Sequence, residues 1–171
     1  PVPDRFHARF SAFGRCYRYI LINRPQRIGV WHGRSGWYHH PLDVDVMREA
    51  AGMLLGEHDF SAFRAADCQA KSPVKTLRVA NVQRSGDLIV FDFEAGAFLH
   101  HMVRNLVGSL VYVGQGKHSI DWMSQLLASG DRRLAAPTFS AHGLYLLRVK
   151  YESHWQLPVI EDSFLQNLSG I

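Results

Sequence analysis

Apolar and polar residues alternate with a period of two in several parts of the chain, and these parts are the expected strands. The alternation covers residues 76–84 and 88–95, and the turn-forming residues between them, 85–87, predict a β-hairpin. A similar run at residues 144–151 predicts another strand. Residues 24–41 contain several glycines and prolines, so a long loop or a set of turns is expected there.

The first segment, residues 6–23, is expected to form two extended pieces that are interrupted near Gly14. In the second piece the strand period places Arg15, Tyr17 and Tyr19 on one face, which is polar and aromatic. The other face is mostly apolar and carries Cys16, Arg18, Ile20 and Ile22.

Three further segments have the spacing of amphipathic helices. Asp43 is a good N-cap for the first helix, which Gly56 would end. The second helix is expected over residues 99–113, and the third would be capped by Ser119 and ended by Gly130. The inner faces of the first and third helices would carry Met47, Ala50, Ala51, Leu54 and Leu55, and Ile120, Met123, Leu126 and Leu127.

Strands and helices segregate along the chain instead of alternating strictly, which favours an α+β fold. The expected architecture is a mainly antiparallel sheet with helices packed on one face. A length of 171 residues with 47% hydrophobic residues suits one domain with its own core. We expect this domain at residues 1–157, and the tail at 158–171 has too little pattern to assign.

Positive charge is concentrated at the start of the chain. The formal net charge is +4, yet residues 1–34 alone hold seven arginines against a single acid, Asp4. Arginine outnumbers lysine 15 to 4. A genome that encodes arginine often would explain this ratio but not the clustering. Because guanidinium groups suit phosphates and base edges, the cluster indicates contact with nucleic acid.

Several function classes find no support in the sequence. No apolar run approaches the roughly 20 residues of a membrane helix, and no secretory leader is recognisable. Cys16 and Cys68 form neither a disulfide framework nor a CxxC pair, so a reducing cytoplasm is expected. The two pairs of adjacent histidines lack metal-site spacing, and phosphate-loop, dinucleotide and serine-hydrolase motifs are absent. We therefore expect no metal.

One arginine stands in a strongly apolar segment, FLHHMVRN, residues 98–105. On the expected helix Arg104 lies opposite the core stripe, yet Val107 and Val111 flank it and no acid occurs from residue 97 to 118. A covered arginine has to be paired, because an unpaired buried charge is costly. Gly108, one turn further along, leaves room for another backbone or a ligand.

Two explanations for Arg104 remain open at this point. It could pair with Asp92 or Glu94 of the preceding strand and tie the helix to the sheet. Alternatively, it could be an active-site arginine that keeps a catalytic carboxylate ionised and oriented. The composition of the chain does not choose between them.

Five sequence blocks occur in the order FHARFSA, RCYRYIL, GEHDFSAFR, AGAFLHHMVRNLVGSL and APTFSAHGLYLLRV. Together, from about Asp4 to Tyr151, they resemble the second half of the tRNA pseudouridine synthase A family. The resemblance implies an isomerase that converts uridine to pseudouridine in the anticodon stem-loop of tRNA. It also implies a cytoplasmic homodimer that needs no metal and no organic cofactor.

The resemblance assigns roles to individual residues of this chain. Tyr17 would lie against the target uracil and act as a base late in the reaction, and Arg104 would be the partner of the catalytic aspartate. Leu144 would line the pocket for the flipped base, where we also expect Phe98 to bind substrate. Contacts with RNA are expected from His7, Arg9, Arg15 and Arg18.

One part of the family pattern is missing from this chain. The nucleophilic aspartate of the family sits in an Arg-Thr-Asp-Ala-Gly motif, and none of the ten aspartates here has those neighbours. The resemblance would therefore make this a C-terminal catalytic half that lacks the nucleophile and is inactive alone. The alternative is a non-catalytic module that binds RNA or assists tRNA folding.

Overall fold

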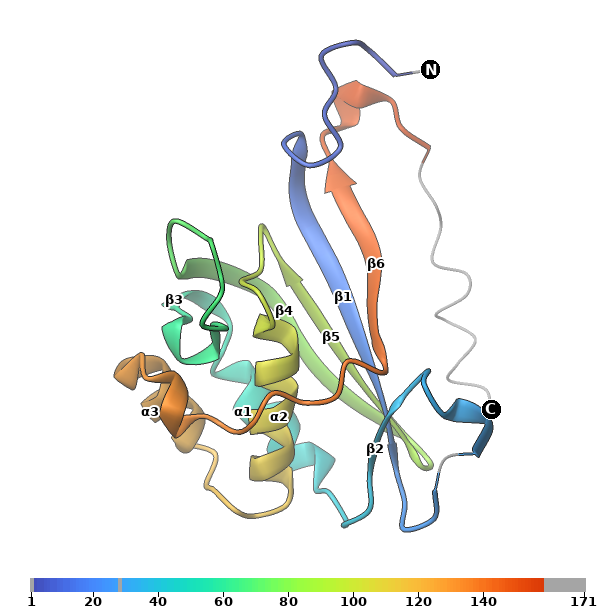
Figure 1. Cartoon of the computed structure of the whole chain (residues 1–171), viewed down its shortest axis with the longest axis vertical. Coiled ribbons are helices and arrows are strands. Elements are labelled where there is room, and N and C mark those ends of the chain that lie inside the picture. The colour runs from blue at the N-terminus through green and yellow to red at the C-terminus, as the bar shows by residue number, and fades with distance from the viewer. Residues whose placement is uncertain (1, 28, 159–171) are drawn as a thin grey trace.

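A computed structural model describes residues 2–27 and 29–158 of the chain (Figure 1). Most of the tail, residues 159–171, lies outside the described residues. The strands are β1 (Ala12–Asn23), β2 (Gly36–Tyr38), β3 (Gly56–Asp59), β4 (Val74–Ser85), β5 (Leu88–Ala95) and β6 (Leu144–Tyr151). The helices are α1 (Val44–Gly52), α2 (Met102–Gly114) and α3 (Trp122–Ser129).

The six strands form a single sheet, and the expected α+β architecture is confirmed. The strand order is β2-β1-β5-β4-β3, and β6 also pairs with β1. One edge of β1 is therefore shared: its first part pairs with β6, and its last three residues pair with β2. Only the pairing of β1 with β2 is parallel. The three helices lie together on one side of the sheet (Figure 1).

The hairpin and the first helix follow the local sequence signals. Strands β4 and β5 pair antiparallel across the expected turn, with Ser85 opposite Leu88. Asp43 caps α1, because its carboxylate accepts hydrogen bonds from the backbone N–H groups of Asp45 and Val46. These elements are decided by neighbouring residues, which is why their sequence signals are sufficient.

Other boundaries differ from the expectation. Strand β1 runs through Gly14 without a break, and only its register against β6 shifts between Ala12 and Gly14. The residues before Ala12 form turns, not a strand. Helix α1 ends at Gly52 because Gly56, with φ of 97°, already begins β3. Helix α3 begins only at Trp122, so Ser119 is not its N-cap.

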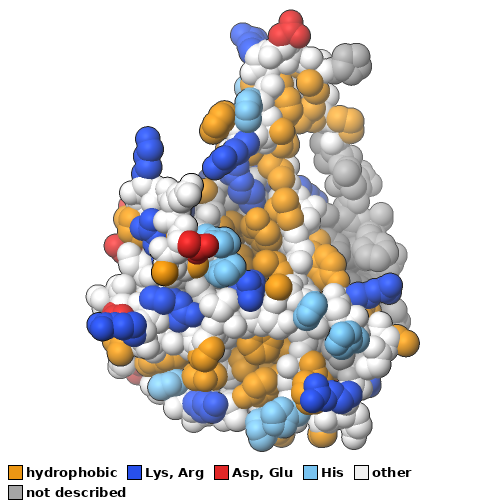
Figure 2. All heavy atoms as spheres, in the orientation of Figure 1, with side chains coloured by type: hydrophobic (Ala, Val, Ile, Leu, Met, Phe, Trp, Pro, Cys, Tyr) orange, Lys and Arg blue, Asp and Glu red, His pale blue; other side chains and the backbone are white. Residues whose placement is uncertain are grey.

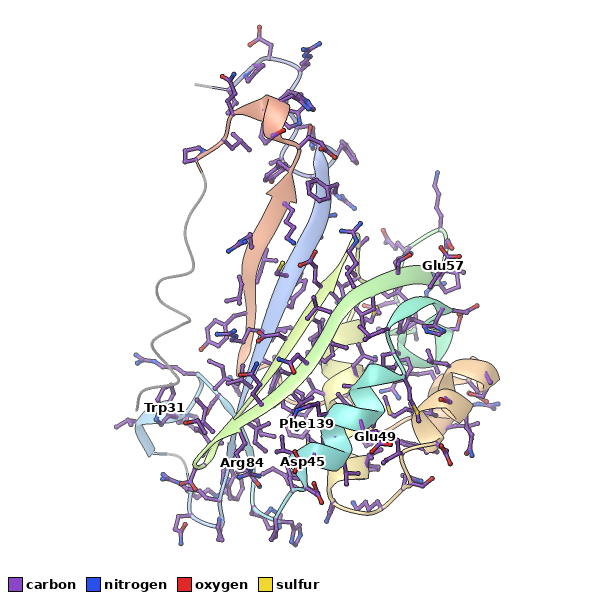
Figure 3. The ribbon with its side chains drawn as sticks, turned by 180° about the vertical axis from the view of Figure 1, so that it is seen from behind. Trp31, Asp45, Glu49, Glu57, Arg84 and Phe139 are labelled. Atoms are coloured by element: carbon purple, nitrogen blue, oxygen red, sulfur yellow. The ribbon has the colours of Figure 1, made fainter. Side chains whose placement is uncertain are left out.

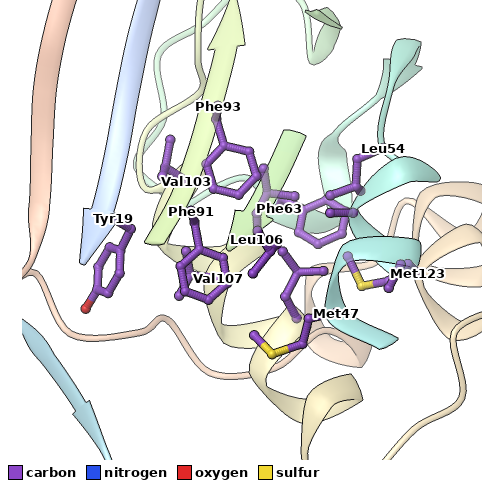
Figure 4. Packing of buried hydrophobic residues seen from close by; sticks show 14 of the residues in the cluster. Tyr19, Met47, Leu54, Phe63, Phe91, Phe93, Val103, Leu106, Val107 and Met123 are labelled. Carbon is purple, nitrogen blue, oxygen red and sulfur yellow. The ribbon is translucent and has the colours of Figure 1, made fainter. Parts of the chain in front are cut away.

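The core lies between the sheet and the helices (Figure 4). Every second residue of β5 is buried there, including Phe91 and Phe93, and α2 contributes Leu106 and Val107. The polar and aromatic face of β1 is also on this side, and Tyr19 is fully buried. Tyr17 lies two residues before Tyr19 in β1 and therefore points to the same side of the sheet, toward the helices.

Candidate active site

One pocket brings together four of the residues that the sequence singles out. The pocket has a volume of about 420 Å³ and lies between β1, the start of α2 and the loop that precedes β6. Figure 2 shows exposed hydrophobic side chains along a hollow beside the helical layer, with histidines next to it. The lining residues of the pocket include Tyr17, Phe98, Arg104 and Leu144, and also Leu99, His100, His101, Met102, Val103 and Ala141.

Aromatic side chains form one wall of the pocket. Tyr17 projects from β1 toward the helical layer, where its ring meets that of Phe98 edge to face at 5.1 Å between centroids and an angle of 84°. Across the sheet Tyr17 is paired with Phe93 of β5 and Leu146 of β6, so its backbone is fixed on both sides. In the described part of the chain the Tyr17 hydroxyl has no hydrogen-bond partner. The hydroxyl is therefore available to a bound molecule.

Arg104 is anchored by one end of its guanidinium. Its Nε donates a hydrogen bond of 2.8 Å to the carbonyl oxygen of Phe139, and the Phe139 N–H donates to the Arg104 carbonyl at 3.3 Å. Within residues 2–27 and 29–158, no carboxylate pairs with Arg104, and its Nη groups make no hydrogen bond. The anchor orients the guanidinium and leaves its terminal N–H groups for a planar anion.

The hypothesis that Arg104 ties α2 to β5 through an acid is wrong. Asp92 accepts a hydrogen bond from Arg18 at 2.7 Å, and Glu94 accepts one from Lys150 at 2.6 Å. Both acids project from the other face of the sheet. Burial tends to raise the pKa of Glu94, but the hydrogen bonds from Lys150 and Cys16 outweigh it and lower that pKa.

Gly108 allows the Phe139 segment to approach α2. A Cβ at Gly108 would lie 2.5 Å from the carbonyl oxygen of Pro137, closer than a real side chain can come. The room expected at this glycine is thus filled by a backbone rather than by a ligand. The same approach brings the Phe139 carbonyl to Arg104, one turn earlier in α2. Figure 3 shows Phe139 between the sheet and the helices.

Asn105 is a positioning residue that the sequence analysis missed. It is fully buried, its Nδ2 donates to the Phe63 carbonyl at 2.7 Å, and its Oδ1 accepts from Thr138 Oγ1 at 2.7 Å. Arg132 also donates to this Oδ1, at 3.1 Å. Thr138 precedes the carbonyl that holds Arg104. An amide among the buried positions of an apolar helix is the signal that could have revealed it.

Replacing Asn105 with alanine is expected to lower the free energy of unfolding by about 3 kcal/mol, because several buried polar groups lose their partner. Chemical denaturation measures this loss. Asn81→Ala on β4 is a suitable control, since no hydrogen bond of the Asn81 side chain occurs in the described residues. A loss no greater than in the control would contradict the positioning role of Asn105.

Two adjacent histidines form the rim of the pocket. His100 Nδ1 lies 3.0 Å from Asp67, and this contact lowers the pKa of Asp67. His101 precedes α2 with φ of 59°, a left-handed conformation that costs energy in a side-chain-bearing residue. Burial, and then the charges of His100 and Arg104, lower the pKa of His101. The lowered pKa favours the uncharged form of His101, which adds no second cation beside Arg104.

The described residues contain no group of three or more histidine, cysteine, aspartate or glutamate side chains that could hold a metal ion. The pocket lining itself includes no carboxylate. The pocket therefore offers an oriented cation, an aromatic wall and an open hydroxyl, but no carboxylate among these residues. None of the described helices has the length and apolarity needed to cross a bilayer.

The expected RNA-binding residues do not all lie together. Arg9, Arg15 and His7 are joined near the start of β1: Arg15 donates to the Arg9 carbonyl at 3.0 Å, and His7 Nδ1 accepts from the Arg9 N–H at 3.1 Å. Arg15 also donates to the Gly96 carbonyl at 2.6 Å. Arg18 lies on the opposite face of the sheet in its ion pair with Asp92, with only 13% of its side chain exposed.

Comparison with known proteins gives one consistent result. The family model described as tRNA pseudouridine synthase matches residues 50–152. A protein of Dechloromonas aromatica (strain RCB) named tRNA pseudouridine synthase A is 62% identical over 168 residues, which are 98% of this chain and 64% of that protein. The protein of the same name from Aromatoleum aromaticum is 64% identical over 155 residues, 91% of this chain and 59% of that protein. The chain thus spans about three fifths of the length of these curated relatives.

Proposed function

The chain belongs to the tRNA pseudouridine synthase family, and from this premise we propose that it supplies one half of an active site that converts uridine to pseudouridine in the anticodon stem-loop of tRNA. The observation that supports the proposal most is the state of Arg104. Its Nε is held by Phe139, while its terminal N–H groups face a pocket that also contains Tyr17. An arginine held in this way is ready to receive a carboxylate.

The carboxylate would come from polypeptide outside this chain. No aspartate here has the neighbours of the family's nucleophile, and no acid among the described residues lines the pocket. In a partly covered site, the guanidinium of Arg104 would lower the pKa of the incoming carboxylate and fix its orientation. Arg104 would thus act through that carboxylate, as its positioning partner.

The other residues of the pocket suit the remaining chemistry. Isomerisation breaks the bond between the sugar and a ring nitrogen and forms a new bond between the sugar and a ring carbon. That ring carbon must then lose its proton. A base released from the sugar needs walls that hold it while it turns, and Tyr17, Phe98 and Leu144 would provide them. Tyr17 would act as the base for this proton: its unpartnered hydroxyl would first lose its own proton to solvent and then take the proton of the ring carbon.

RNA would reach the pocket along the basic start of the chain. His7, Arg9 and Arg15 lie on the stretch of chain that leads to Tyr17, and Phe10, 76% exposed, offers a surface on which an unstacked base can lie. Arg18, on the other face, would contact RNA only if its pair with Asp92 broke.

We further infer a cytoplasmic homodimer, as the family resemblance implies.

The proposal predicts that the chain alone is inactive and that activity returns when the missing part is supplied. The protein to test is a chimera in which the part of the D. aromatica relative that this chain does not match is joined to it. Pseudouridine formation in unmodified tRNA, measured by release of tritium from the labelled ring carbon, should be detectable only with the chimera. Turnover by the isolated chain would contradict the proposal of an incomplete site.

The same experiment separates catalysis from RNA binding alone. A chimera that binds tRNA without forming pseudouridine would favour the alternative, a module that binds RNA or assists its folding. Both functions require binding that weakens steeply with salt, because contacts with several phosphates release counterions. Affinity that does not change between low and high salt would contradict both.

A further inference from the structure

A second pocket lies on the other side of the loop that lines the first. It has a volume of about 490 Å³ and is formed by residues of the segment before β2, by Trp37 of β2 and by residues just before β6. The loop is shared: Ala141 and Leu144 line the first pocket, whereas Ser140 and His142 line the second. Among the described residues, the polar and aromatic part of its lining consists of Arg27, His32, Ser35, Trp37, Ser140 and His142.

Arg27 is held against an aromatic ring and has no acidic partner in the described residues. Its guanidinium carbon lies 4.4 Å from the centroid of the Trp37 ring. The indole is itself fixed, because its Nε1 donates to the carbonyls of Arg24 and Gln26 at 3.0 and 3.1 Å. The neighbouring Arg24, by contrast, pairs with Asp87 at 3.5 Å. Stacking thus orients Arg27 while leaving its N–H groups open.

Two histidines complete the polar lining. The rings of His32 and His142 lie 6.2 Å apart between centroids, and both side chains are exposed to solvent. No carboxylate occurs among the described residues that line the pocket. A stacked guanidinium, two imidazoles and a nearby serine form a site for a phosphate group, because all of them can donate hydrogen bonds to its oxygens.

We propose that this second pocket binds a backbone phosphate of the tRNA strand, next to the uridine whose base enters the first pocket. The inference rests on the proposed function. Phosphate contacts position a nucleic-acid strand, so a contact beside the target uridine would hold the backbone while its base leaves the stack. A single loop separates the two pockets, so one strand of RNA can occupy both at neighbouring nucleotides.

The test removes the charge from each side of the contact. Stem-loop RNAs carry an uncharged methylphosphonate at either phosphate beside the target uridine, and they are titrated with the chain and with its Arg27→Gln variant. Each change alone should weaken binding roughly tenfold, and at one of the two positions both changes together should weaken it no further. The Arg27→Gln variant should also reduce the slope of log affinity against log salt by about 1.

Control variants distinguish a local contact from a general loss of charge. Arg133→Gln removes the same charge from a side chain that is 89% exposed and pairs with Asp131, so its effect should add to that of either methylphosphonate. His142→Gln probes the other side of the pocket and should show the same coupling as Arg27→Gln. Arg27 is exposed, so its replacement leaves the core intact.

The outcomes separate this inference from the proposed function. One outcome would overturn the phosphate pocket alone. In that outcome the unchanged chain binds RNA tightly, and the loss caused by Arg27→Gln adds fully to the loss caused by the methylphosphonate at both positions. Failure of both the unchanged chain and the chimera to bind RNA would overturn both. A titration with inorganic phosphate, monitored through the NMR signals of His32 and His142, tests whether the pocket binds the free anion. Binding of free phosphate without any coupling to the RNA backbone would show a small-anion site instead.

Discussion

Replacing Arg104 with alanine in the chimera is expected to lower the turnover of tRNA about a thousandfold while leaving tRNA affinity nearly unchanged. The reason is the division of its guanidinium between two tasks. Nε is committed to the Phe139 carbonyl, and only the terminal N–H groups remain for the proposed catalytic carboxylate. Loss of these groups would affect that carboxylate rather than the proposed RNA-binding surface.

The pH dependence tests this electrostatic role directly. Without the guanidinium the pKa of the catalytic carboxylate should rise by roughly 1 to 3 units. In the proposed reaction the carboxylate acts in its ionised form, so the acidic limb of the pH–rate profile should move to higher pH by the same amount. A merely structural role of Arg104 would reduce the rate equally at every pH and would leave this limb in place.

Two control variants sharpen the result for Arg104. Arg104→Lys keeps the charge but cannot both donate to Phe139 and bind a carboxylate through two parallel N–H groups, so it should restore only part of the rate. Arg133→Ala removes a largely exposed arginine outside the pocket and should leave turnover unchanged. Normal kinetics in the Arg104→Ala chimera would refute the assigned role.

The parts of the fold that follow from the sequence are those decided by nearby residues. The β4–β5 hairpin and the Asp43 cap of α1 depend on contacts within a few positions. The short strands β2 and β3 could not be predicted, because they exist only through pairing with β1 and β4. Pairing with Lys150 of β6 also keeps Gly14 within β1, although a glycine normally weakens a strand.

The face of β1 that carries Tyr19 shows a second limit of prediction from sequence. Tyr19 counts as polar in a sequence pattern, yet it is fully buried because its hydroxyl donates to the Ser140 carbonyl at 2.8 Å. Burial raises the pKa of Tyr19, so the hydroxyl remains a neutral donor. Its acceptor lies 121 residues further along the chain. No local pattern contains that information.

In the candidate active site, too, the sequence predicts a residue but not the group that it contacts. The apolar surroundings of Arg104 predict that its charge needs a partner, and this part is decided within one helix. The identity of the anchoring carbonyl, Phe139, depends on how residues 137–139 pack on Gly108. Asn105 fixes the neighbouring Thr138, again through a tertiary contact. Sequence patterns thus identify the candidate residue but not the backbone that orients it.

The second large effect is expected at Gly143, which lies just before β6 and has φ of 94°. A Cβ there would meet two backbone atoms, Gly36 N at 2.6 Å and Ile20 O still closer. The Gly143 carbonyl also accepts a hydrogen bond of 2.8 Å from the Ile20 N–H. Gly143 therefore sits where β1 exchanges its partner from β6 to β2, and the backbone around it has no room to yield.

Gly143→Ala is expected to lower the free energy of unfolding by about 4 kcal/mol, since the left-handed backbone and the overlap with two strands both oppose the methyl group. The measurement is chemical denaturation of the chain beside Gly52→Ala, where an added Cβ meets nothing within 4 Å. That control is the last residue of α1 and should instead gain up to about 1 kcal/mol. Equal stabilities of the two variants would contradict the close packing of backbone around Gly143. The loop before β6 would then be free to move, and Ala141 and Leu144 could not form a fixed wall of the pocket.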